Sequence, residues 1–79
     1  MKLHIVVPIT GLQPQFAYYF WMRHILPTSV NGLSKESAAD TFQITSVSPN
    51  RFERRVGVIP AEEMHEIASA IALCIGYTP

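Results

Sequence analysis

Leu3-His-Ile-Val-Val-Pro-Ile-Thr10 and Gly32-Leu-Ser-Lys-Glu-Ser-Ala-Ala-Asp-Thr-Phe-Gln-Ile-Thr-Ser-Val47 are the two stretches that decide the fold. The first is rich in Val and Ile, a composition typical of a β-strand. Both of its faces are largely apolar, which predicts a central strand buried on both sides. Pro8 has no N–H to give to a ladder, so we expect a bulge or a break in pairing near it.

The rest of the chain predicts three more strands and a C-terminal helix. The strands are expected over residues 16–26, 37–47 and 56–59, with a short helical turn over residues 49–55. Pro60 suits the first position of a helix, and Gly76 suits its end. Between them, apolar residues recur at spacings of three and four, which predicts one buried stripe along the helix. The residues of this stripe are Met64, Ile67, Ala68, Ile71, Cys74 and Ile75.

The chain has 79 residues, which predicts a single domain over residues 1–79. Apolar residues make up 48% of it and charged residues only 15%, and a domain of this size has a thin core. We therefore expect part of the apolar surface to be covered by a second copy or by another partner. Six Lys or Arg balance six Asp or Glu, so a general electrostatic attraction to nucleic acid is absent, and RNA would have to bind a local patch.

A single cysteine, Cys74, leaves no internal disulfide within these residues, which fits a reducing compartment. No stretch reaches the roughly 18–20 apolar residues of a membrane span, so no membrane partner is predicted. The opening Met-Lys-Leu-His is unlike a secretory signal. These features predict a cytoplasmic protein.

The two opening stretches, the segment Arg51-Phe-Glu-Arg-Arg-Val-Gly-Val-Ile-Pro60 and the helix after it resemble the body of the PemK/MazF family. Its members are toxins of bacterial type II toxin–antitoxin pairs. The resemblance covers nearly the whole chain and implies a mainly β fold with a C-terminal α-helix, the small SH3-like barrel that CcdB-like toxins share. The family's first hairpin has no counterpart here, so we expect a barrel that is incomplete at its N-terminus.

The resemblance implies an endoribonuclease that cleaves single-stranded RNA without a metal or other cofactor, with a cognate antitoxin and a second copy as partners. The family usually draws a catalytic Arg from the loop of its first hairpin, a segment that this chain lacks. The alternative is therefore a catalytically inactive, truncated toxin that only dimerises or binds antitoxin, and a third possibility is a fragment without a function of its own. Gyrase-poisoning toxins share the barrel, but the stretch that ends at Val47 favours the ribonuclease branch.

Thr10 and Asp40 are the candidate catalytic residues. In the family, the Thr that ends the Val-Val-Pro-Ile-Thr motif lines the RNA groove and helps to hold the scissile phosphate, a role that a hydroxyl donor suits. The alternative for Thr10 is a strand-end residue bonded to its own turn. Family members commonly carry an acidic residue where this chain has Phe42 and a basic one where it has Thr45. Asp40 is the candidate for the displaced carboxylate, and the alternative is a solvated residue at a strand start.

Gln43, Ser37 and Arg51 are the candidate RNA-binding residues. The amide of Gln43 is suited to reading base edges, although a plain outward-facing strand residue is its alternative. Arg51 forms the basic cluster of the chain with Arg54 and Arg55, and a helical turn would place these three on one face. Such a face would hold phosphates bidentately, whereas the alternative is a solvated surface.

Aromatic residues are concentrated in the second predicted strand. They are Phe16, Tyr18, Tyr19, Phe20 and Trp21. Unpaired RNA bases could stack on such rings, but in so small a chain a place in the core or on a partner-facing surface is the stronger expectation. Strand alternation would put the rings on both faces. The three histidines, His4, His24 and His65, are scattered and none is a candidate catalyst. No spacing of Cys, His and Asp suggests a metal site.

Overall fold

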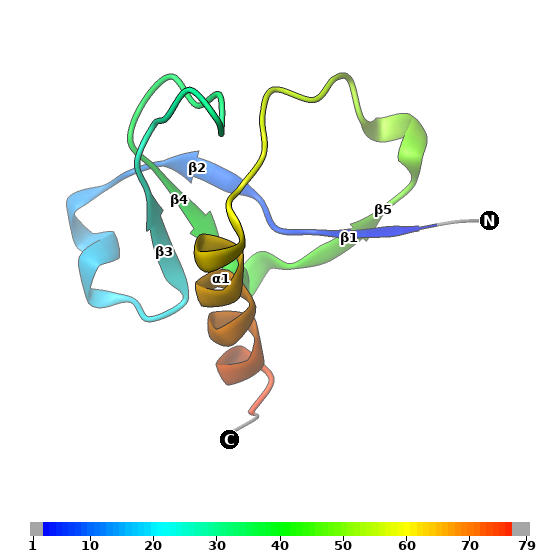
Figure 1. The fold of residues 1–79 in the computed structure, drawn as a ribbon. Helices are drawn as coiled ribbons and strands as arrows, with labels where there is room; N and C mark the ends of the chain where they lie inside the picture. The colour runs from blue at the N-terminus through cyan, green and yellow to red at the C-terminus, as the bar shows by residue number, and fades with distance from the viewer. Residues whose placement is uncertain (1–2, 77–79) are drawn as a thin grey trace.

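The computed structural model describes residues 3–76 as two antiparallel sheets and one C-terminal helix (Figure 1). The strands are β1 (His4–Val6), β2 (Ile9–Gly11), β3 (Met22–Ile25), β4 (Ser37–Asp40) and β5 (Thr45–Val47). Three short 3₁₀-helices interrupt them: η1 (Pro14–Tyr18), η2 (Thr41–Gln43) and η3 (Pro49–Arg51). The long helix is α1 (Ala61–Cys74). The fold is mainly β with a C-terminal helix, as the sequence predicts.

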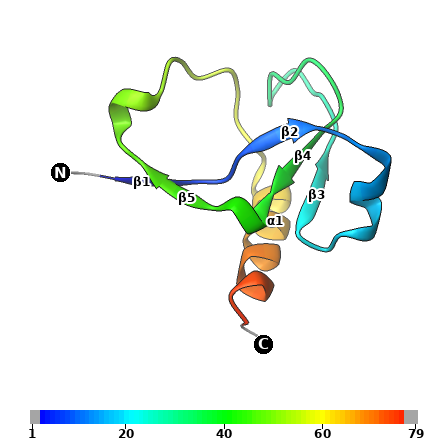
Figure 2. The same ribbon diagram turned by 180° about the vertical axis from the view of Figure 1, so that it is seen from behind.

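β4 is the middle strand of the larger sheet, whose order is β2-β4-β3, while β1 pairs with β5 in a separate two-stranded sheet. The two-stranded sheet forms an arm that extends away from the rest of the molecule, and both views of the ribbon show it (Figures 1 and 2). Every pairing within the two sheets is antiparallel. The chain passes between the sheets twice, once around Pro8 and once through η2.

Pro8 divides the first predicted strand into β1 and β2, which confirms the expected break in pairing. The carbonyl oxygen of Pro8 still accepts a hydrogen bond from the N–H of Asp40 at 2.9 Å, but the proline has no N–H to return. Because each half joins a different sheet, the prediction of one central strand buried on both faces is wrong. β2 is an edge strand, and Ile5 on β1 is 75% exposed.

The second predicted strand, over residues 16–26, is wrong in its first half. Pro14 starts η1 instead, and the N–H of Phe16 donates to the carbonyl of Gln13 at 3.0 Å. The N–H of Tyr19 then donates to the carbonyl of Phe16 at 3.1 Å, which closes a second tight turn. The alternation of aromatic side chains between two strand faces therefore does not apply, because the strand itself begins only at Met22.

The third predicted strand, over residues 37–47, is interrupted by η2. The hydroxyl of Thr41 is fully buried and donates to the carbonyl of Trp21 at 2.7 Å. The carboxylate of Asp40 accepts the N–H of Phe42 at 3.2 Å and so caps the turn. These two bonds hold the turn at which the backbone leaves the larger sheet, and β5 follows in the smaller one.

The fourth predicted strand, over residues 56–59, is also wrong, because this segment packs against a loop instead of a strand. The N–H of Val58 donates to the carbonyl of Val30 at 2.9 Å. Gly32 has a φ of +69°, and a Cβ there would lie 2.0 Å from the carbonyl oxygen of Val56. Asn31 is 3% exposed and holds the loop together. Its side chain accepts from the N–H groups of Thr28 and Leu33 and donates to the carbonyl of Leu26.

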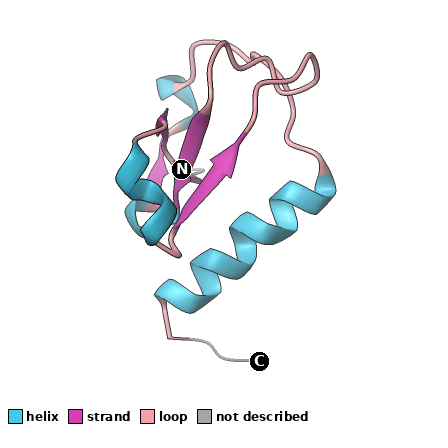
Figure 3. Ribbon diagram, turned by 90° about the vertical axis from the view of Figure 1, so that its left-hand side faces the viewer, coloured by secondary structure: helices cyan, strands magenta, loops and turns pink. Residues whose placement is uncertain are grey.

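α1 packs along one face of the larger sheet, as the side view shows (Figure 3). Ile67 of the helix, at 5% exposure, meets Ile25 and Ala39 of the sheet to form the core. The predicted stripe is partly wrong, because Met64, Ala68 and Ile75 are exposed, whereas Ala70 is buried. Glu62 and Glu63 occupy the first turn, where the helix dipole favours carboxylates. No helix among the described residues is both long enough and apolar enough to cross a membrane.

Replacing Ile67 with Ala should lower the free energy of unfolding by about 2–5 kcal/mol, because the change leaves a cavity between α1 and the sheet. Ile75→Ala removes the same atoms from an exposed position and should change stability by less than about 0.5 kcal/mol. Urea unfolding followed by circular dichroism measures both. Equal effects of the two substitutions would contradict the packing described here.

Candidate functional site

Thr10, Ala38 and His24 form a row across the sheet on the face opposite α1. Thr10 and His24 both pair directly with Ala38, one from each side. Residues that lie directly opposite in a ladder point to the same face, and successive residues along a strand point to opposite faces. Because Ala39 faces the helix core, Ala38 and its two partners face away from it.

Asp40 belongs to the same face, since it follows Ala38 by two residues along β4. Thr10 and Asp40 are diagonal neighbours on adjacent strands, a relation that separates Cα atoms by about 7–8 Å. Thr10 is exposed and Asp40 is half-buried. The structure therefore brings the two predicted catalytic residues to one side of the sheet.

Asp40 is held firmly at this position. Its N–H donates to the carbonyl of Pro8 at 2.9 Å, while its carboxylate accepts the N–H of Phe42 at 3.2 Å. A carboxylate fixed in this way is an acceptor of defined position on the face of the sheet that it shares with Thr10. Such a pair can accept a proton from a bound hydroxyl group and donate a hydrogen bond to a neighbouring oxygen.

The three predicted RNA-binding residues do not gather around this pair. Ser37 pairs with Gly11 and Ile25, so it belongs to the face that α1 covers. It is 4% exposed, and its hydroxyl donates to the carbonyl of Lys35 at 2.9 Å. Gln43 is exposed at the end of η2, and Arg51 is exposed at the end of η3.

The predicted helical turn with a basic face is wrong, because η3 ends at Arg51 and leaves Arg54 and Arg55 in a segment without regular secondary structure. A cation that sequence reasoning missed lies beside β2, on the face of the sheet opposite Thr10. The ammonium of Lys35 packs against Gly11, the residue after Thr10, and a Cβ on Gly11 would lie 3.1 Å from its nitrogen. A Cβ at this position would require the end of the lysine side chain to shift by a few tenths of an ångström.

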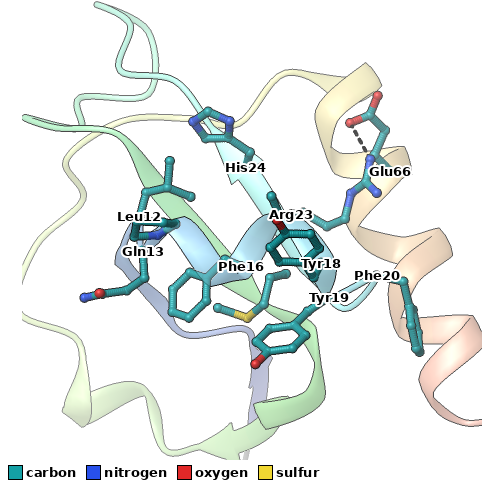
Figure 4. Close-up of a pocket in the computed structure, with 12 residues that line it drawn as sticks. Leu12, Gln13, Phe16, Tyr18, Tyr19, Phe20, Arg23, His24 and Glu66 are labelled. Atoms are coloured by element: carbon teal, nitrogen blue, oxygen red, sulfur yellow. Dashed lines mark hydrogen bonds and ion pairs between the residues drawn. The ribbon is translucent and has the colours of Figure 1, made fainter.

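A second feature that the sequence did not reveal is an aromatic groove, an open cavity of about 830 Å³ between η1, β3 and α1 (Figure 4). Its aromatic walls come mostly from η1 and the turn after it. The lining residues include Leu12, Gln13, Phe16, Tyr18, Tyr19, Phe20, Met22, Arg23, His24 and Glu66. The 3₁₀ conformation of η1 creates this wall, and no strand-based prediction could have found it.

Ring contacts connect the aromatic groove with η2. Tyr19 stacks on Trp21 with ring centroids 4.7 Å apart, and Trp21 meets Phe42 edge-on at 5.5 Å. Arg23 of β3 forms an ion pair with Glu66 of α1 at 3.2 Å, which is visible on the helix side of the groove (Figure 4). The charge of Arg23 is thus balanced by an acid within the groove itself. Among residues 3–76, no three His, Cys, Asp or Glu side chains are grouped so as to hold a metal ion.

Comparisons with known proteins connect this geometry to a family. The model of PemK-like, MazF-like toxins of type II toxin–antitoxin systems matches residues 2–75. The solved structure of the Mycobacterium tuberculosis toxin MazF-mt6 superposes with a TM-score of 0.80 at 19% sequence identity. That match covers 100% of this chain and 75% of the other. At 19% identity, the similarity is evidence for a shared fold only. No curated protein sequence matches.

Thr41→Val should lower the free energy of unfolding by about 1 kcal/mol, because valine keeps the shape of the side chain but loses the hydrogen bond to the Trp21 carbonyl. The fluorescence of Trp21, the single tryptophan of the chain, should report a loosened environment. Thr45→Val, at an exposed strand position, is the matched control. A Thr41 variant as stable as this control would show that the bond does not anchor the aromatic residues.

Proposed function

This chain belongs to the PemK-like, MazF-like toxins of type II toxin–antitoxin systems, and we propose that it acts as a metal-independent endoribonuclease on single-stranded RNA. The observation that carries the proposal is that Thr10 and the tethered carboxylate of Asp40 lie on the same face of the sheet. Family membership implies an antitoxin as a partner. RNA as substrate, a homodimer as the assembly and the cytoplasm as the site of action complete the proposal.

The proposed reaction is attack of a ribose 2′-hydroxyl on the adjacent phosphate. The products are a 2′,3′-cyclic phosphate and a free 5′-hydroxyl. Asp40 takes the proton from the attacking hydroxyl as general base. The Thr10 hydroxyl donates a hydrogen bond to a phosphate oxygen on which negative charge develops. The departing 5′-oxygen takes its proton from solvent water as the bond to phosphorus breaks.

Several described residues have the chemistry to hold the RNA beside this pair. Lys35 is exposed, with its ammonium against Gly11 on the edge strand β2, and is suited to a phosphate of an RNA strand that runs past this edge. Gln43 and Arg51 are exposed and free to contact a base edge and a phosphate, respectively. The hydroxyl of Ser37 is buried and already engaged, and this placement gives it the weakest support as an RNA contact.

A second candidate function is binding without cleavage, as a toxin-like chain that only dimerises or binds antitoxin. The observation that favours it is the balance of six basic and six acidic residues, which gives little general attraction for RNA. The exposed apolar side chains of the β1–β5 arm also suit contact with another chain, since Leu3 and Ile5 are 57% and 75% exposed.

Asp40→Asn should reduce kcat/KM for a single-stranded RNA at least about 100-fold, because the amide cannot accept the proton. Asn keeps the acceptor that caps η2, so the fold should persist. Thr10→Ala should also reduce kcat/KM by about 100-fold or more, through loss of the donor to the phosphate oxygen. Gel assays of cleavage with end-group analysis measure both effects.

Thr45→Ala, at an exposed position of β5, is the control and should cleave like the parent chain. Cleavage should continue in EDTA and leave a 5′-hydroxyl. Cleavage that requires a divalent ion, or full cleavage activity of the Asp40→Asn variant, would contradict this mechanism. An inactive parent chain that still binds antitoxin would favour the second candidate function.

Lys35→Gln should weaken RNA binding uniformly across sequences and lower the slope of log affinity against log salt by about 0.7, the value for one phosphate contact on a single strand. Lys35→Arg keeps the charge and is the matched control. Fluorescence anisotropy of a labelled RNA at several salt concentrations measures the slope. An unchanged slope would remove Lys35 from the proposed phosphate contacts.

A further inference from the structure

We propose that the exposed ring of Phe42 is the surface on which an unpaired base of the RNA stacks, next to the bond that is cut. The inference rests on the proposed function and deepens it, because it names the part of the substrate that η2 recognises. Phe42 takes no part in the proton transfers. It binds the nucleotide and orients it beside Asp40.

The position of Phe42 is the first argument. Its backbone N–H donates to the carboxylate of Asp40 at 3.2 Å, so the ring branches from a backbone position that directly contacts the proposed general base. In the proposed reaction, the attacking 2′-hydroxyl belongs to a ribose that also carries a base. Stacking of that base on Phe42 therefore brings its own ribose to the side of Asp40.

The rigidity of the Phe42 ring is the second argument. Among residues 3–76, Trp21 is the one ring that meets it, edge-on at 5.5 Å with the ring planes at 73°. Trp21 is itself held in place, because Tyr19 stacks on it at 4.7 Å and its carbonyl accepts the buried Thr41 hydroxyl at 2.7 Å. A ring that is already fixed loses little conformational freedom when a ligand binds, which favours affinity.

The accessibility of the ring is the third argument. Phe42 is 57% exposed in spite of its contact with Trp21. An edge-on contact involves the rim of one ring and a single face of the other, so at least one face of Phe42 is free of the other described rings. Unpaired RNA bases are commonly held by stacking on such faces, and every base has a π-face to offer.

The groups on either side of Phe42 favour a nucleobase over an apolar protein partner. The half-buried carboxylate of Asp40 precedes it in η2, and the exposed amide of Gln43 follows it. An apolar protein surface over the ring would also cover these polar groups, which costs free energy unless each finds a partner. A base has donors and acceptors along its edge as well as a flat apolar face, so it suits both the ring and its polar neighbours.

Binding of a labelled 2′-O-methyl RNA oligonucleotide tests the proposal without cleavage, because a methylated 2′-oxygen cannot attack the phosphate. Phe42→Leu keeps an apolar side chain but removes the ring, and it should weaken binding at least about fivefold, as expected for the loss of one stacked base. Phe42→Tyr keeps the ring and should bind within about twofold of the parent chain. Fluorescence anisotropy measures these affinities.

Phe52 offers a matched control within the same chain. It is 52% exposed and meets His4 edge-on at 5.5 Å, so its ring is presented in a similar way, but it packs against β1 of the arm and not against Trp21. Phe52→Leu should therefore bind the oligonucleotide within about twofold of the parent chain. Equal losses of affinity in Phe42→Leu and Phe52→Leu, or no loss in Phe42→Leu, would overturn the proposal.

A fluorescent base reports the stacking itself. With 2-aminopurine in an otherwise uridine 2′-O-methyl oligonucleotide, saturating parent chain and Phe42→Tyr should quench the emission of the base, whereas saturating Phe42→Leu should not. Quenching that persists in Phe42→Leu would place the base on other rings and would overturn the proposal. If Phe42→Leu does not fold by circular dichroism, the unmodified chain decides: the Phe42 ring protons should shift upfield in NMR spectra when the oligonucleotide binds, and unshifted protons would contradict stacking.

Cleavage of unmethylated RNA by the parent chain is measured separately. Base stacking on Phe42 without cleavage would contradict the proposed nuclease function and support this inference. Cleavage by Phe42→Leu with the KM of the parent chain would overturn this inference and leave the nuclease function supported. A parent chain that binds no oligonucleotide would overturn both.

Discussion

The antiparallel register of β4 with both of its neighbours is the constraint on which the rest of the structure depends. Ala38 and Ala39 are almost fully buried, and their small side chains let other elements approach both faces of the strand closely. On one face, Ala39 contacts the core residues that bind α1 to the sheet. On the other face, Ala38 separates Thr10 from His24. The same pairing thus fixes the helix and the candidate catalytic pair.

Sequence patterns predicted the elements that depend on periodicity and missed those that depend on local hydrogen bonds. The helix and the break at Pro8 follow from apolar spacing and from the missing proline N–H. η1 and η2 do not, since η1 is closed by a three-residue bond from Phe16 to the Gln13 carbonyl that leaves no apolar period, and η2 depends on the buried Thr41 hydroxyl meeting the distant Trp21 carbonyl. The sequence of residues 56–59 suggested a strand because three of its four residues are β-branched, yet the segment bonds to the Val30 carbonyl and pairs with no strand among the described residues.

The candidate functional residues divide in the same way, into those that the sequence identifies and those that only the folded structure reveals. Thr10 was identifiable because it ends the Val-Val-Pro-Ile-Thr motif. Asp40 was identifiable because it is a carboxylate two residues before Phe42, the position at which family members commonly carry an acidic residue. Their common face could not be predicted, since it follows from the register of two strand pairs. The position of Lys35 and the aromatic groove could not be predicted from the sequence. The first depends on a contact between the lysine ammonium and Gly11, and the second depends on the conformation of η1. The molecule thereby carries two chemically different surfaces, a polar one around Asp40 and a nearly neutral aromatic one beside β3.

The loop around Asn31 has a consequence for the chemical lifetime of the protein. Asn-Gly sequences are prone to deamidation, in which the backbone nitrogen of the glycine attacks the side-chain amide and forms a succinimide. Here the N–H of Gly32 is engaged with the carbonyl of Thr28 at 3.0 Å, and the Asn31 amide nitrogen is held by Leu26 at 2.8 Å. Both reacting groups are therefore restrained away from attack. The hydrogen bonds that shape this loop also protect the folded chain from a spontaneous reaction that its unfolded form would undergo.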